Sequence, residues 1–313
     1  MIDHTATRLP AAGTHGGDGA RVAAALGIDP ASMIDLSASM NPFAPDVAHL
    51  LAGILHTDTS AVHRYPDPTG ATGALAAAID VDPDLLVVTN GGAEAIALTA
   101  AHVGTGSIVE PEFSLYRRHL HTIDPDAPRW RSNPSNPLGR LADPGDTAAV
   151  WDEAFYPIAT GRWTRGDDHA WRLGSLTKLW NCPGLRLGYV IAPTPDTARA
   201  IRDLQPRWAV NGLALAALPE LLAVTDLSGW AIQIAALRNQ FATALTTLGF
   251  HATPTEANWL LVEHRGLRAG IAPHGVLVRD CAGFGLGDVH RVALPAPAQL
   301  DAVLQAFAAI CER

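Results

Sequence analysis

The chain has 313 residues, of which 48% are hydrophobic, and its formal net charge is −9 at pH 7. The length allows a large hydrophobic core and more than one lobe, and the negative charge argues against a nucleic-acid partner. No apolar run approaches the roughly 18 residues of a membrane span, and the N-terminus lacks an apolar signal core, so we expect a cytoplasmic protein with no membrane partner.

Cysteine and histidine usage indicates neither a disulfide nor a metal site. Cys182, Cys281 and Cys311 are far apart and odd in number, which is typical of reduced thiols. The 13 histidines include no pair with HExxH-like spacing, so scattered surface or core histidines are the better interpretation. We therefore expect no metal.

Residues 43–205 alternate short apolar runs with helical stretches, which predicts a large α/β domain. The expected strands cover residues 85–89, 107–110, 148–151, 171–174 and 187–192. Helices are expected after the first two of these strands. Polar candidates repeatedly follow the strands, at the edge where an open parallel sheet binds ligands.

The remainder of the chain predicts a smaller α/β domain over residues 206–313. A helix over residues 195–204 is expected to end the large domain. In the smaller domain, the expected helices cover residues 228–248 and 298–311, and the expected strands cover residues 258–263, 275–279 and 290–294. Residues 1–42 have little core of their own, so we expect an N-terminal arm that packs across both domains.

Lys178 lies in the most informative stretch, Ser175-Leu-Thr177-Lys178, which a Pro-Gly turn separates from Arg186. A lysine becomes a nucleophile when its pKa falls, and an aldehyde cofactor then traps it as a Schiff base. The two hydroxyls and the arginine could hold the phosphate of such a cofactor. Arg186 could instead be a surface or interlobe arginine.

Three further motifs allow both a structural and a chemical interpretation. Gly92 and Ala93 stand at an expected helix N-terminus, whose amides bind phosphate, but glycines there are also common in turns. Asp152 ends an expected strand, where a carboxylate caps a helix or keeps a pyridine nitrogen protonated. Asn136, between two prolines, belongs to a plain turn or donates a hydrogen bond to a cofactor oxygen.

Five segments in chain order together resemble one enzyme family. They are Asn90-Gly-Gly-Ala-Glu94, Pro111-Glu-Phe113-Ser-Leu-Tyr116, Asn133-Pro-Ser-Asn136-Pro-Leu-Gly139, Asp152-Glu-Ala-Phe155 and the stretch from Ser175 to Tyr189. From about Gly16 onwards the chain resembles the fold-type I enzymes of the class I/II aminotransferase superfamily, which use pyridoxal 5'-phosphate (PLP). The resemblance implies an α/β fold with a mostly parallel central sheet in a large domain, and a small α/β C-terminal domain.

The resemblance also implies roles for residues around PLP. Lys178 would form the Schiff base, and Asp152 would pair with the ring nitrogen. Asn136 would face the 3'-oxygen, and Phe113 would stack on the ring. The cofactor phosphate would be held by Gly92, Ala93, Ser175, Thr177 and Arg186. Tyr65 matches a tyrosine that reaches the phosphate in the neighbouring subunit, which implies a homodimer with shared active sites.

Two branches of the superfamily fit the chain: threonine-phosphate decarboxylase of cobalamin biosynthesis and histidinol-phosphate aminotransferase. The runs 15–18, 34–42 and 278–287 are similar to the decarboxylase. Phe155 also replaces the tyrosine that aminotransferases commonly place three residues after the aspartate. We therefore expect a small phosphorylated amino acid, O-phospho-L-threonine, as substrate.

The resemblance implies four substrate-binding candidates, which are His15, Asn41, Arg279 and Arg291. Arg291 matches the arginine that binds a substrate carboxylate, whereas Arg279 could form a plain salt bridge. Two departures concern the substrate more than the cofactor. Ser39 stands where the decarboxylase branch usually has asparagine, and residues 114–135 are shorter than usual, which predicts a reduced sheet edge.

Three hypotheses follow from these features. The first is a lyase that releases CO2 from O-phospho-L-threonine, and the second is an aminotransferase acting on histidinol phosphate or another amino acid. The third is a non-catalytic PLP-fold protein, against which the complete set of Lys178, Asp152, Asn136 and Arg186 argues.

Overall fold

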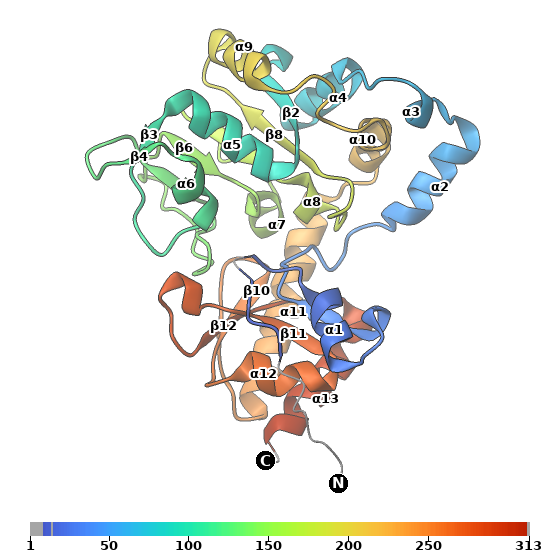
Figure 1. Ribbon diagram of the computed structural model, residues 1–313, viewed down its shortest axis with the longest axis vertical. Coiled ribbons are helices and arrows are strands. Elements are labelled where there is room, and N and C mark those ends of the chain that lie inside the picture. The colour runs from blue at the N-terminus through green and yellow to red at the C-terminus, as the bar shows by residue number, and fades with distance from the viewer. Residues whose placement is uncertain (1–8, 14, 312–313) are drawn as a thin grey trace. The chain divides into compact units, whose positions relative to one another are not determined.

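The computed structural model describes residues 9–13 and 15–311 (Figure 1). The chain divides into two compact units, a larger one of residues 43–233 and a smaller one that joins the described residues up to 42 with those from 234 onwards. The N-terminal segment therefore belongs to the smaller unit, and residues 206–233 belong to the larger one. Both assignments differ from the domain boundaries that the sequence suggests.

A five-stranded sheet forms the centre of the larger unit, in the order β2-β8-β7-β6-β5. β5, β6 and β7 are parallel, and β8 is antiparallel to both of its neighbours. All strands except β8 thus point the same way, as a mostly parallel sheet requires. The strands are β2 (Leu86–Asn90), β5 (Trp130–Ser132), β6 (Val150–Asp152), β7 (Trp171–Gly174) and β8 (Leu187–Ile191).

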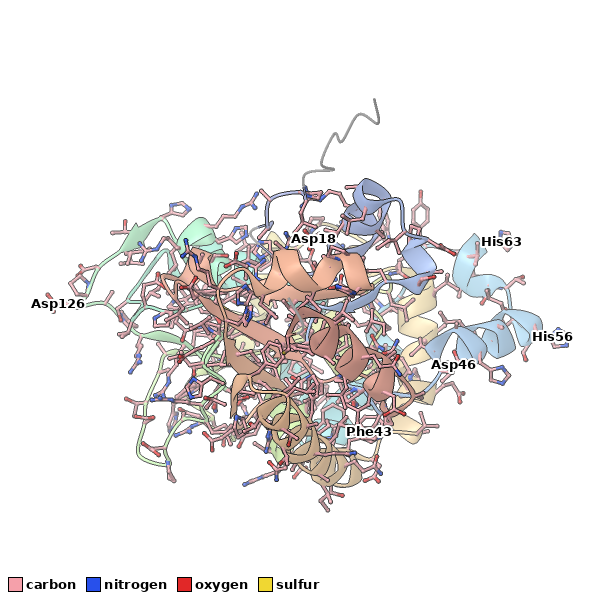
Figure 2. The ribbon with its side chains drawn as sticks, turned by 90° about the horizontal axis from the view of Figure 1, so that it is seen from below. Asp18, Phe43, Asp46, His56, His63 and Asp126 are labelled. Carbon is pink, nitrogen blue, oxygen red and sulfur yellow. The ribbon has the colours of Figure 1, made fainter. Side chains whose placement is uncertain are left out.

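Helices pack around this sheet, and local sequence explains several of their ends. The Asp46 carboxylate accepts a hydrogen bond from the His49 amide and begins α2, whose last turn holds His56 (Figure 2). Thr194 and Thr197 cap the start of α9 reciprocally. The helices are α2 (Val47–Thr57), α3 (Ser60–His63), α4 (Thr69–Ile79), α5 (Gly91–Val103), α6 (Ser114–His119), α7 (Tyr156–Thr160), α8 (Leu176–Leu179), α9 (Pro195–Leu204), α10 (Gly212–Ala223) and α11 (Leu227–Thr247), which continues into the smaller unit.

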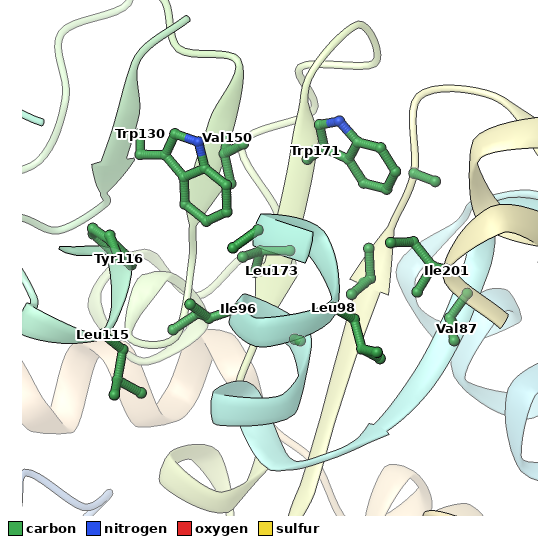
Figure 3. Packing of buried hydrophobic residues seen from close by; sticks show 14 of the residues in the cluster. Val87, Ile96, Leu98, Leu115, Tyr116, Trp130, Val150, Trp171, Leu173 and Ile201 are labelled. Carbon is green, nitrogen blue, oxygen red and sulfur yellow. The ribbon is translucent and has the colours of Figure 1, made fainter. Parts of the chain in front are cut away.

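One apolar cluster fixes α5 on the sheet. Ile96 and Leu98 of α5 are buried together with Leu173 of β7 and Val87 of β2 (Figure 3). Burial of each such side chain stabilises the fold by about 1.5–3 kcal/mol. The packing holds the N-terminus of α5 at the end of the sheet where β2 and β7 finish.

The sheet is short at the edge formed by residues 114–135. β5 has three residues, and a separate pair consists of β3 (Thr105–Gly106) and β4 (Thr122–Ile123). The expected strand over residues 107–110 is wrong, because only Ser107 continues the pairing, through a single bridge to Arg129. The chain turns there: Glu110 accepts a hydrogen bond from the Glu112 amide, and Pro111 between them has no N–H to offer a ladder.

The smaller unit has a second five-stranded sheet, in the order β1-β11-β12-β10-β9. β1 pairs with β11 in parallel, which explains why the N-terminal segment belongs to this unit, and the other pairs are antiparallel. Its strands are β1 (Ile34–Leu36), β9 (His251–Pro254), β10 (Trp259–Glu263), β11 (Val276–Asp280) and β12 (Val289–Ala293). Its helices are α1 (Gly19–Leu26), α12 (Leu267–Ile271) and α13 (Leu300–Cys311). Short 3₁₀ helices in the two units are η1 (Pro30–Ser32), η2 (Pro83–Leu85), η3 (Ala272–His274), η4 (Ala282–Phe284) and η5 (Pro297–Gln299).

Among the described residues, no single helix is both long enough and apolar enough to cross a membrane. The bent pair α10 and α11 passes such a test only when the two helices are taken together, by length and composition alone.

Candidate active site

The turn from β2 into α5 presents a helix N-terminus to Ser175 and Arg186. Gly91 has φ +78°, a left-handed conformation that favours glycine. A Cβ added to Gly91 would lie 2.5 Å from Nη2 of Arg186, and one added to Gly92 would lie 3.3 Å from Cβ of Ser175. Three kinds of donor therefore meet here: the amides of the first turn of α5, a hydroxyl and a guanidinium. Such a set binds a phosphate.

Arg186 itself has φ +57°, which is uncommon for a residue with a side chain. Its guanidinium donates to the carbonyl of Pro183 at 3.3 Å, across the Pro-Gly turn that follows α8. Backbone conformations of this kind cost about 1–3 kcal/mol and persist where the surrounding structure requires them. The turn thus directs Arg186 to the N-terminus of α5.

Lys178 is half-buried in α8, directly after β7. Its Nζ lies 5.7 Å from the ring centroid of Phe155, the residue that begins α7. Lys178 is also the only lysine in the sequence, since the other 21 basic residues are arginines. The motifs alone do not reveal that Lys178 is the single lysine, a fact that leaves one side chain as the candidate for amine chemistry.

Asp152 ends β6 as a buried carboxyl. The Tyr116 hydroxyl donates to its Oδ2 at 2.7 Å, and the Ala154 amide donates to its Oδ1 at 3.0 Å. Burial raises the pKa of Asp152, while the Tyr116 hydrogen bond, the Ala154 amide and the charge of Lys178 lower it. A cationic N–H partner would stabilise the ionised form of this carboxyl.

Asn136 and Phe113 lie in segments that approach each other through Ser132. Asn136 is buried, and its backbone amide donates to Oγ of Ser132 at 2.9 Å. Phe113 precedes α6 and makes an edge contact with the ring of Tyr116, at 6.0 Å between centroids. Their predicted contacts with a cofactor ring stay predictions.

Sequence reasoning missed a buried polar group beside Asp152. Glu112 accepts hydrogen bonds from the hydroxyl and the amide of Ser132, and Tyr116 donates to Asp152. These partners are 20 and 36 residues apart in the chain. The available signal was the Glu112 carboxyl between a proline and an aromatic residue, but its burial cannot be read from the sequence.

Two predicted cofactor residues have other contacts. The Thr177 hydroxyl donates to the carbonyl of Leu187 at 3.2 Å, which ties α8 to β8. Tyr65 is 78% exposed and stacks on the half-exposed ring of Trp208, with centroids 4.4 Å apart. Tyr65 also lines a pocket of about 350 Å³ between α3, α4 and α10. Its predicted role in a neighbouring subunit stays a prediction.

The four predicted substrate residues all lie in the smaller unit. Arg279 of β11 and Arg291 of β12 are direct register partners, and both are buried. Arg279 donates to the carbonyl of Gly13 at 2.6 Å, and Arg291 donates to that of Ser37 at 3.1 Å. His15 is exposed and Asn41 is buried.

The arginine pair is electrostatically unusual. Burial and, less strongly, the charge of Arg279 lower the pKa of Arg291 to about 10, although Cys281 opposes the fall. Like charges opposite each other on neighbouring strands destabilise a sheet. An anion bound by both guanidinium groups would remove that repulsion.

No cluster of three or more His, Cys, Asp or Glu side chains suitable for a metal ion occurs within residues 9–13 and 15–311.

Comparison with known proteins identifies the family. A family model described as "Aminotransferase class I and II" matches residues 131–307. Threonine-phosphate decarboxylase of Salmonella typhimurium is 30% identical and is matched over 94% of this chain and 95% of its own length. Histidinol-phosphate aminotransferase 1 of Mesorhizobium japonicum is 26% identical, over 89% and 90% respectively. The solved structure of histidinol-phosphate aminotransferase from Clostridium acetobutylicum has a TM-score of 0.78 at 20% identity, covering 90% of this chain and 99% of that one.

The polar groups of the larger unit fit PLP. Side chains at positions 91 and 92 would take up space beside Arg186 and Ser175, so the glycines leave room for an anion such as the cofactor phosphate. Asp152 is a buried carboxyl that a pyridinium N–H would stabilise, and Lys178 is the single side-chain amine. The chain has the fold-type I architecture and belongs to the class I and II aminotransferase family of PLP-dependent enzymes.

Proposed function

We propose that the protein is a PLP-dependent lyase that decarboxylates O-phospho-L-threonine to aminopropanol phosphate and CO2, as in cobalamin biosynthesis. The observation that carries the proposal is the pair of buried arginines, Arg279 and Arg291, on neighbouring strands. O-phospho-L-threonine has two anionic groups, a phosphate and a carboxylate, whereas histidinol phosphate has only the phosphate. The 30% identity to a threonine-phosphate decarboxylase over nearly the whole chain supports the same choice.

PLP, when bound, supplies an electron sink for the electrons of the bond that breaks at the substrate Cα. In the proposal, Asp152 holds a proton on the ring nitrogen, and Ser175, Arg186 and the first turn of α5 hold the phosphate. Arg279 and Arg291 orient the substrate through its two anionic groups. The orientation decides whether the carboxylate or the hydrogen on Cα leaves.

Lys178 moves the proton that completes the reaction. As CO2 leaves, the bond between Cα and the carboxylate carbon breaks, and a proton must take the place of the carboxylate on Cα. Nζ of Lys178 is the group proposed to deliver this proton. Phe155, 5.7 Å from Nζ, offers no hydroxyl that could compete for this amine. This supports Lys178 as the proton donor.

The alternative is an aminotransferase that acts on histidinol phosphate or another amino acid. The similarity to histidinol-phosphate aminotransferases favours it, at 26% identity to the one from Mesorhizobium japonicum. It needs the same cofactor residues and a second substrate, a 2-oxo acid. 2-Oxoglutarate also has two anionic groups, so the arginine pair does not exclude this reaction.

One assay separates the two activities. The PLP-loaded protein is given O-phospho-L-threonine while CO2 is measured, and then histidinol phosphate with 2-oxoglutarate while glutamate is measured. The proposal predicts CO2 and no glutamate, and rapid glutamate without CO2 would overturn it. Lys178→Ala is the control, because any CO2 that it produces comes from free PLP.

A further inference from the structure

Glu112 is a buried carboxyl that the proposed reaction does not use. The hydroxyl and the amide of Ser132 donate to its two oxygens at 2.5 and 3.0 Å, and the Phe113 amide donates at 3.2 Å. Glu112 takes part in no ion pair of the described chain. It therefore joins the segment of Phe113 to the strand β5, and does so without a cation.

Two hydroxyls connect Glu112 to Asp152. The Ser132 hydroxyl, which donates to Glu112, also lies close enough to the Tyr116 phenol to lower its pKa, against the stronger effect of burial, which raises it. Tyr116 donates in turn to Oδ2 of Asp152 at 2.7 Å. The Asn136 amide donates to the same Ser132 oxygen at 2.9 Å. The order along this line is Glu112, Ser132, Tyr116, Asp152, and Ser132 is the branch towards Asn136.

The electrostatic surroundings place the ionisation of Glu112 in the physiological range. Burial and, less strongly, the charge of Asp152 raise the pKa of Glu112 to about 7, against the Ser132 and Phe113 donors, which lower it. The groups that face Glu112 are thus Asp152 on β6, Ser132 on β5 and, through Ser132, Tyr116 on α6. Lys178 on α8 acts on the same line through Asp152.

The direction of the Ser132 hydroxyl depends on which form Glu112 takes. Opposite an ionised Glu112, Ser132 donates its one hydroxyl hydrogen to the carboxylate. A protonated Glu112 instead donates to Ser132 Oγ, and the Ser132 hydrogen is then available to the neighbouring Tyr116 phenol. The phenol that receives this hydrogen bond donates more strongly to Asp152, because linked hydrogen bonds polarise one another.

We propose that Glu112 is a positioning residue for the cofactor: its charge is passed to Asp152 along Ser132 and Tyr116, and it sets how strongly the site holds a cationic ring nitrogen. An ionised Glu112 adds a negative charge and leaves Asp152 a stronger acceptor, so both effects favour the cation. The inference rests on the proposed role of Asp152 and not on the substrate.

The test measures the dissociation constant of PLP from the PLP-free protein at pH 6 and pH 8. Because binding favours ionised Glu112, the wild-type protein should bind PLP more tightly at pH 8 for this reason. In Glu112→Gln, the ratio of the two constants should fall by about fivefold, at the lower end of coupling between linked sites. Glu110→Gln is the matched control: it lies two residues away, at an exposed ion pair with Arg117, and should keep the wild-type ratio.

Tyr116→Phe keeps the ring and the Glu112 charge but removes the hydroxyl that donates to Asp152. It should also reduce the ratio of the PLP dissociation constants at pH 6 and pH 8. It also decides the question if Glu112→Gln does not fold. A wild-type ratio in Glu112→Gln, or in Tyr116→Phe, would overturn the proposal. Failure of the wild-type protein to bind PLP would instead contradict the cofactor assignment, so the two failures are distinguishable.

Discussion

Lys178 is the residue on which the proposed chemistry depends, and the sequence offers no second lysine in its place. No other lysine exists in the chain, so an aldehyde cofactor can attach only there or at the α-amino group of the N-terminus. Lys178→Ala should abolish the visible absorption band of lysine-bound PLP and reduce CO2 release to background.

Borohydride reduction followed by peptide mass spectrometry checks this assignment. The wild-type protein should carry one PLP adduct, on the peptide that contains Lys178. The N-terminal peptide of the same sample is the internal control, because it reports nonspecific reaction with amines. An absorption band that survives in Lys178→Ala would show that the wrong amine was chosen.

Single residues of the site differ in how far the sequence could predict them. Lys178, Asp152, Asn136 and Arg186 stand in short motifs whose order along the chain resembles one enzyme family, and that resemblance was enough to select them. Glu112 was not selected, because its significance comes from burial and from hydrogen bonds to residues distant in sequence. Motifs reveal groups that act on a ligand, whereas groups that act through other residues depend on tertiary contacts.

Secondary-structure elements followed the apolar pattern where the run was continuous. The helix over residues 195–204 and the strand over residues 171–174 have the predicted bounds. The strand expected over residues 107–110 failed, because an apolar pair next to a proline lacks the partner strand that would complete its ladder. The local apolar pattern thus predicts where a strand can form, but whether it forms depends on a partner strand beside it in the sheet.

The contact between β8 and the N-terminus of α5 gives a prediction at this scale. A Cβ added to Gly188 would lie 2.5 Å from the backbone carbon of Gly91 and 2.6 Å from the backbone nitrogen of Gly92, so backbone would have to move. We expect Gly188→Ala to destabilise the protein by about 1–3 kcal/mol, as overpacking does. It should also weaken PLP binding by about tenfold or more, which corresponds to roughly 1.4 kcal/mol.

Denaturant unfolding and PLP titration measure the two effects. Gly184→Ala, in the same segment, is the matched control, since an added Cβ there meets nothing within 4 Å. Equal PLP affinities in the two variants would contradict the role given to the α5 N-terminus.

At the scale of the whole molecule, the sequence did not predict which parts belong together. Residues 34–36 look like an isolated short run, yet they pair in parallel with β11, about 240 residues later. Residues 206–233, which the sequence assigned to the small domain, belong to the larger unit together with residues 43–205. Such groupings depend on pairing between distant segments, for which a single sequence carries no periodic signal.

The change of stability with pH is a property of the whole fold, and the buried carboxyl of Glu153 predicts its direction. Burial raises the pKa of Glu153 from 4.5 to about 7, although the donors of Thr164 and Arg165 oppose the rise. The folded protein therefore binds a proton that the unfolded chain releases, and stability should fall as the pH rises from about 4.5 through 7. One such group accounts for at most roughly 3 kcal/mol of that fall.

Urea unfolding of the PLP-free protein at pH 5 and pH 8 measures this fall. Glu153→Gln keeps an oxygen for the Arg165 amide and removes the charge, so its stability should fall less between the two pH values. Glu220→Gln, on the exposed side of α10, should keep the wild-type slope. An unchanged slope in Glu153→Gln would mean that other groups carry the dependence.

The proposed homodimer makes a prediction that no single-chain effect can imitate. Tyr65 and Trp208 form an exposed aromatic stack, 78% and 56% exposed, which is unusual for large apolar rings unless another surface covers them.

If Tyr65 serves the neighbouring subunit, Tyr65→Ala and Lys178→Ala should each lose activity, and mixed dimers of the two should regain it. One site of each mixed dimer then has both residues, so random exchange restores about a quarter of the sites. Native mass spectrometry confirms exchange, because the mass of the mixed dimer lies between those of the two parent dimers, and each variant incubated alone is the control. A mixture that exchanges subunits and stays inactive would show that Tyr65 acts in the active site of its own chain.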